Sequence, residues 1–77
     1  MTINDLTAGE SGFIDKVGGE GALRVRLLDM GLTPGTKVSF IKTAPMGDPI
    51  QIALRGYELT IRRDDAALIT ISEVEKA

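Results

Sequence analysis

The 77-residue sequence contains no cysteine and no histidine. Without these residue types the chain has no disulfides, no ordinary ligand set for structural zinc, and no imidazole for general-base or triad chemistry. Because covalent and metal cross-links are missing from so small a domain, its stability has to come from a hydrophobic core. The missing cysteine is consistent with a reducing, cytoplasmic setting.

Long apolar runs and aromatic side chains are also scarce. No stretch approaches the ~20 apolar residues of a membrane-spanning helix, and the first residues lack the basic and apolar regions of a secretory signal. We therefore expect a single domain over residues 1–77, without direct insertion into a membrane. With two phenylalanines, one tyrosine and a net charge of −2, the chain lacks the stacking platforms and basic surplus typical of nucleic-acid binding.

Charge is unevenly distributed along the chain. Between residues 22 and 63 basic side chains outnumber acidic ones, whereas the two ends carry most of the acidic residues. A basic middle in an acidic protein indicates a solvated face or a surface that steers a protein partner.

The stretch 23–35 contains the one helix that the apolar periodicity supports. Leu23, Leu27 and Met30 share a helix face, which we expect to pack on the core. Gly31 directly follows this face, so it predicts a helix end in the left-handed conformation. A Thr-Pro-Gly triplet farther on predicts a tight turn into a strand.

The same helix carries a second apolar strip. Val25 and Leu28 project away from the first face, with Arg24 and Arg26 beside them. Such a strip either lies under a loop of the same chain, as in many very small domains, or stays open as a docking surface. As a docking surface it would have an apolar centre and an arginine rim, which is the usual composition of a binding hot spot.

Alternation of apolar and polar residues predicts five short strands, and the Arg55-Gly56 link predicts a tight hairpin between the third and the fourth. The strands are expected at residues 11–17, 36–42, 50–54, 57–62 and 67–72, with an aspartate-capped helical turn at 63–66 and a charged tail at the end. So few strands favour a small, strongly bent β-barrel that leaves little open edge and is plugged or capped by the helix.

A loop rich in proline and glycine interrupts the strands at residues 44–49. Its composition excludes a central strand, and its Met46 is an adaptable side chain that we expect near the surface. We predict that this loop lies near the outward strip of the helix. The predicted partner-binding residues are Val25, Leu28, Arg24, Arg26, Pro45, Met46 and Gly47.

Several segments, taken in order, carry a family resemblance. They are residues 27–35 (LLDMGLTPG), 38–40 (VSF), 44–49 (APMGDP), the hairpin over 50–61, and 67–71 (ALITI). Together they resemble the FeoA family of ferrous iron transport accessory proteins, over about residues 6–71. The resemblance implies a mainly β, SH3-like barrel with one short helix. It also implies a cytoplasmic protein that works with FeoB, a membrane transporter carrying a GTPase domain.

No group of residues has the pattern of an active site. The glycine-rich stretch 18–21 lacks the lysine and hydroxyl of a phosphate-binding loop, and Asp64-Asp65 is more consistent with a helix cap, so we expect neither catalysis nor a cofactor. Iron binding would rest on carboxylates alone, whereas ferrous sites more often include imidazole, so we predict no dedicated metal site. The available carboxylates are Asp48, Asp64, Asp65, Glu73 and Glu75.

Two functions remain open. The first is an accessory protein that binds FeoB and modulates ferrous iron uptake, and the second is a sensor that binds Fe²⁺ and reports it to a partner. The missing histidine and cysteine favour the first. An adaptor for proline-rich peptides is disfavoured, because such grooves need several aromatic side chains and this chain has Phe13, Phe40 and Tyr57 alone. The sequence leaves open whether the partner is activated or inhibited and whether the chain self-associates.

Overall fold

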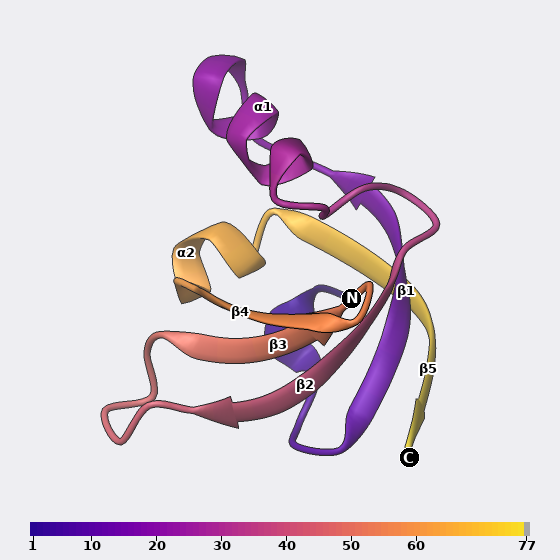
Figure 1. The fold of residues 1–77 in the computed structure, drawn as a ribbon, viewed down its shortest axis with the longest axis vertical. Coiled ribbons are helices and arrows are strands. Elements are labelled where there is room, and N and C mark those ends of the chain that lie inside the picture. Colours follow the sequence, from indigo (N-terminus) through magenta and orange to yellow (C-terminus); the bar gives the residue numbers. More distant parts are fainter. Residues whose placement is uncertain (77) are drawn as a thin grey trace.

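The computed structural model describes residues 1–76, whose strands form one five-stranded antiparallel sheet that is strongly bent (Figure 1). The strands are β1 (Glu10–Val17), β2 (Lys37–Thr43), β3 (Ile50–Leu54), β4 (Tyr57–Ile61) and β5 (Ile69–Lys76), in the spatial order β4-β3-β2-β1-β5. The helical elements are η1 (Ile3–Asp5), α1 (Gly21–Asp29) and α2 (Arg63–Ala66). This architecture confirms the predicted mainly β, SH3-like fold.

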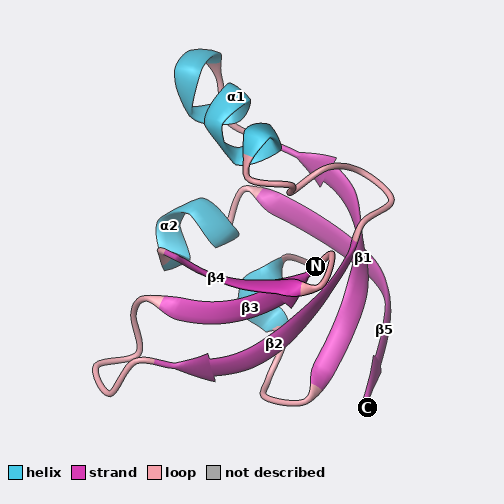
Figure 2. Ribbon diagram, in the orientation of Figure 1, coloured by secondary structure: helices cyan, strands magenta, loops and turns pink. Residues whose placement is uncertain are grey.

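The sheet is less closed than predicted. Its edge strands β4 and β5 do not pair with each other in the described residues, and α2 connects them (Figure 2). A four-residue helix fits there because the chain has to turn from one edge of the bent sheet to the other. One side of β4 therefore remains an open edge, contrary to the expected barrel with little open edge.

Along the strands, every second side chain points to the inside of the sheet and is buried there, as predicted. Ile50, Ile52 and Leu54 on β3 are buried, while the residues between them are partly exposed. Val38 and Phe40 on β2 are buried on the predicted side of their strand. The hairpin between β3 and β4 pairs Leu54 with Tyr57. Its two linking residues have the positive φ angles that a tight antiparallel turn requires.

The chain before β1 fills the inside of the bent sheet, a role that the sequence had assigned to the longer helix. Ile3 of η1 is fully buried and Leu6 nearly so, whereas α1 projects away from the sheet (Figure 1). The Asn4 side chain holds this segment in place by donating to the carbonyl oxygen of Arg63 at 2.9 Å. The main helix therefore does not plug the barrel; it lies at one end of the sheet, where Leu27 enters the core.

Two further expectations are corrected at the C-terminal end. The predicted charged tail belongs to β5, because β1 is long enough to pair with it: Glu10 lies opposite Lys76 and Ser11 opposite Glu75. The short helix α2 has Arg62 at its N-cap and no side-chain cap of its own. Instead, Asp48 Oδ1 accepts the backbone N–H of Arg63 at 3.0 Å, so the aspartate at this helix start comes from a distant loop.

Candidate docking surface

The end of α1 has the geometry that its sequence predicts. The backbone N–H of Leu32 donates to the carbonyl of Leu27 at 3.2 Å, and that of Gly31 donates to the carbonyl of Leu28 at 3.0 Å. Gly31 has φ +96°, so these bonds complete a left-handed cap in which the chain folds back on the last turn. The cap therefore ends α1 and turns the chain toward β2.

The face of α1 that was expected to pack on the core does so only in part. Leu27 is 1% exposed, but Leu23 and Met30 are only half-buried at the margin of the core. The helix leaves the sheet at an end where few strands continue beneath it (Figure 1). Leu27 is therefore the one fully buried anchor of the helix, with Leu23, Leu28 and Met30 packed at the margin of the core, and the rest of its surface remains open.

The outward strip divides into an exposed and a half-buried part. Val25 is 57% exposed, and Arg24 and Arg26 beside it are exposed as well. Leu28, by contrast, is half-buried and packs against the core, so only part of its side chain is open to solvent. The exposed face of α1 is consequently Val25 flanked by arginines, with Leu28 at its margin.

The loop at residues 44–49 does not lie near this face. α1 and the β2–β3 loop are at opposite ends of the molecule (Figure 1), so the structure separates the predicted surface into two. Met46 at the loop tip is 91% exposed, Pro45 is exposed and Gly47 is half-buried. Arg63 Nε donates to the carbonyl of Gly47 at 2.6 Å, which ties the loop to α2.

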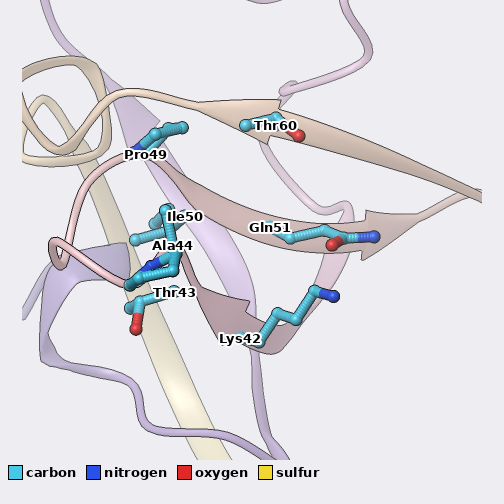
Figure 3. Close-up of a pocket in the computed structure, with 8 residues that line it drawn as sticks. Lys42, Thr43, Ala44, Pro49, Ile50, Gln51 and Thr60 are labelled. Atoms are coloured by element: carbon cyan, nitrogen blue, oxygen red, sulfur yellow. The ribbon is translucent and has the colours of Figure 1, made fainter.

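A shallow depression of about 350 Å³ lies at the base of this loop (Figure 3). Its walls come from the ends of β2 and β3, the loop prolines and Thr60 of β4. Lys42 and Gln51 are the long polar side chains at its border, and no acid–base pair converges there. The depression therefore has the form of a contact surface and lacks the polar groups of a catalytic site.

The carboxylates considered for iron are dispersed. Within residues 1–76, no three aspartates or glutamates come together in a group that could hold a metal ion. Asp48 is engaged by the Arg63 backbone, and the Glu75 carboxylate lies 3.4 Å from Lys37 Nζ. In the same part of the chain, no helix is both long and apolar enough to cross a bilayer.

A bent five-stranded sheet around one apolar core, with a projecting helix at one end, defines a small SH3-like domain. The sequence matches the FeoA domain family over residues 1–73. The chain belongs to the FeoA family. FeoA is not known as a family of enzymes, in agreement with the prediction.

Solved structures of related proteins have the same fold. The FeoA protein of Chlorobium tepidum is 41% identical with a TM-score of 0.85, over 92% of this chain and 68% of that one. The iron(II) transport protein A of Clostridium thermocellum is 31% identical with a TM-score of 0.88, over 92% of this chain and 44% of that one. FeoA of Stenotrophomonas maltophilia, a prokaryotic SH3 domain protein, is 21% identical with a TM-score of 0.86 over 99% and 96%, and it supports the fold alone.

In one relative, a transport protein A segment and a FeoB transporter are fused in a single polypeptide. The Fe(2+) transport protein A/Fe(2+) transporter FeoB fusion protein of Porphyromonas gingivalis is 34% identical over 71 residues. The match covers 92% of this chain but only 8% of the fusion protein. The chain therefore corresponds to a small part of that relative.

Proposed function

We propose that this chain is a cytoplasmic accessory protein of ferrous iron uptake that binds a FeoB-type transporter and modulates it. The observation that carries the proposal is the fusion relative, in which a homologous segment and FeoB share one polypeptide. Tethering two domains raises the effective concentration of each for the other, which is useful where the domains act together. A separate chain of the same family would make the same contact in trans.

The proposed docking element is α1, and its proposed occupant is the cytoplasmic part of the transporter. Support comes from the exposed Val25, which offers apolar area at the centre of the helix face, and from Arg24 and Arg26 at its rim. Apolar contacts of this kind supply affinity, whereas rim charges mainly set the rate of encounter. Leu28 would contribute through its exposed margin.

The loop surface formed by Pro45, Met46 and Gly47 is the alternative docking site. It has the most exposed large apolar side chain in the described part of the chain, Met46. Because it lies at the other end of the molecule from α1, substitutions at the two sites distinguish the alternatives.

The test is a titration of the chain into the purified cytoplasmic part of a FeoB-type transporter from the same organism. We expect saturable one-to-one binding, and we expect cells lacking the chain to show altered ferrous iron uptake that the gene restores. An absence of binding together with normal uptake in the deletion strain would contradict the proposal.

The sensor function has weaker support, because the carboxylates in residues 1–76 do not converge. Anaerobic calorimetric titration with Fe²⁺ should show no site tighter than about 10 µM, which corresponds to about −7 kcal/mol. A stoichiometric submicromolar site would instead favour the sensor.

A further inference from the structure

The tip of the β3–β4 hairpin reaches the end of α1. Tyr57 donates its phenolic O–H to the backbone carbonyl of Met30, the C-cap residue of the helix. Carbonyl groups in the last turn of a helix have no intrahelical partner, so a side chain from another element can supply one. The Tyr57 side chain is 44% exposed, so its hydroxyl makes this contact at the surface of the domain.

Arg55, in the same hairpin turn, binds the segment that follows the helix. Its Nη2 donates to Thr33 Oγ1 at 2.8 Å and to Thr36 Oγ1 at 2.9 Å. The two hydroxyl oxygens are themselves hydrogen-bonded at 2.9 Å, and the Thr36 backbone N–H donates to the Thr33 carbonyl at 3.1 Å. One guanidinium group thereby holds both ends of the turn that joins α1 to β2.

Gly31 makes this approach possible. A Cβ atom at position 31 would lie 2.6 Å from the Tyr57 hydroxyl oxygen, which is closer than such atoms can be. Glycine thus serves two purposes here, because it also adopts the positive φ of the helix cap. The hairpin tip and the helix cap fit each other as one unit.

The remaining apolar contacts of α1 lie at the margin of the core, where Leu23, Leu28 and Met30 are half-buried and pack against it. Leu27 is the one fully buried residue of the helix, and the residues of its first turn are exposed apart from the half-buried Leu23. Arg24 Nε donates to the carbonyl of Val17 at 3.2 Å. Because only Leu27 is fully buried, the polar contacts at the C-terminal end of α1 contribute to holding its direction.

We propose that Arg55 and Tyr57 form a latch that fixes the direction of α1 relative to the barrel. They are positioning residues, which hold Val25 and its neighbouring arginines in the orientation that a partner meets. The link to the partner rests on the proposed function, whereas the control of helix direction does not. A preorganised helix binds more tightly, because the partner does not have to select one direction from many.

Distance measurements between spin labels test the latch directly. The chain has no cysteine, so an Ala22→Cys, Thr60→Cys pair places one label on exposed α1 and one on exposed β4 without background. We expect a narrow distance distribution that broadens when Tyr57→Phe removes the hydroxyl and keeps the ring. A Lys16→Cys, Thr60→Cys pair, with both labels on the sheet, is the control and should not change. An unchanged α1 distribution in the Tyr57→Phe variant would overturn the latch.

Arg55→Asn supplies an independent second variant. Arg55 has φ +50°, a conformation that asparagine tolerates better than most residues, so this change removes the guanidinium without straining the turn. We expect broadening here as well, and more in the double variant. Narrow distributions in both single variants and in the double variant would contradict the proposal even if all three variants fold.

Affinity for the cytoplasmic part of the transporter tests whether the latch matters for binding, separately from whether it fixes the direction of α1. Each latch variant should bind about 3- to 10-fold more weakly, as expected for the loss of one hydrogen bond that preorganises a site. A broadened distribution with unchanged affinity would overturn the link between the latch and the partner. If the unmodified chain does not bind the transporter at all, the proposed function fails, and the spin-label distances still decide whether the latch exists.

Discussion

The sheet and α1 are stabilised in different ways. In the sheet, every strand contributes buried side chains, and β3 alone buries Ile50, Ile52 and Leu54. The nine-residue helix α1 fully buries only Leu27, packs Leu23 and Leu28 at the margin of the core, and makes polar contacts at its C-terminal end. Most residues that stabilise the fold therefore lie on the sheet, whereas α1 carries exposed side chains beside its one fully buried residue, so the two roles can be separated by substitution.

The contrast between the sheet and α1 requires that Leu27 contributes to stability and that the exposed residues of the same helix do not. Leu27→Ala should lower the free energy of unfolding by roughly 2 to 5 kcal/mol, because it removes the buried side chain that anchors α1 and leaves a cavity. Val25→Ala is the matched control and should change stability by less than about 0.5 kcal/mol. Urea unfolding of both variants is the measurement, and a similar small loss in both would mean that α1 is not anchored to the core.

A substitution at Gly31 tests the contact between the end of α1 and the β3–β4 hairpin. Gly31→Ala should destabilise by about 1 to 3 kcal/mol, because alanine is strained at positive φ and its Cβ would collide with the Tyr57 hydroxyl. The same change in a Tyr57→Phe background should cost less, since only the backbone strain remains. If Gly31→Ala lowered the free energy of unfolding equally in both backgrounds, the Tyr57 hydroxyl would not be in contact with the helix cap.

A substitution at Asp48 tests the contact between the 44–49 loop and the start of α2. Asp48→Ala should destabilise by about 0.5 to 1.5 kcal/mol, because the Arg63 backbone N–H loses its acceptor at the start of α2. Asp64→Ala, within α2 itself, is the control and should change stability by less than about 0.5 kcal/mol. A larger loss of stability for Asp64→Ala than for Asp48→Ala would instead support the local aspartate cap that the sequence predicted.

Glu10 gives the smallest expected effect. The backbone N–H and the hydroxyl of Thr7 donate to its carboxylate and hold the pKa of Glu10 below its ordinary value. A lowered pKa in the folded state stabilises the fold above the ordinary pKa of 4.5, and this stabilisation is lost as the pH falls through the lower, folded-state value. Melting temperatures measured from pH 7 to pH 3 should fall less steeply in Glu10→Gln. An identical slope in the two proteins would argue against this bond.

Local patterns predicted the features that depend on neighbours in sequence. The β3–β4 hairpin, the Gly31 cap and the alternation of β2 each depend on residues within one element or turn, and the structure confirms them. The family resemblance supplied the SH3-like architecture, which the bent five-stranded sheet and its structural neighbours confirm.

Long-range contacts explain the features that the sequence could not predict. Asn4 and Arg63 are 59 positions apart, yet their bond holds the segment that fills the barrel. Arg55 meets Thr33 across 22 positions and Tyr57 meets Met30 across 27, with no periodic pattern that would indicate either pair. The split of the predicted docking surface has the same origin, because the direction of α1 is set by contacts between elements and not by its own sequence.

The central claim is that the exposed face of α1 binds the cytoplasmic part of the transporter. The most direct test compares the affinity of Val25→Glu with that of Met46→Glu, two exposed apolar residues at opposite ends of the molecule. Both variants should melt within about 3 °C of the unmodified chain, because neither side chain is in the core. We predict that Val25→Glu weakens binding by at least about tenfold and that Met46→Glu leaves it unchanged. Unchanged binding of Val25→Glu with loss of binding in Met46→Glu would contradict the account and place the docking surface on the 44–49 loop.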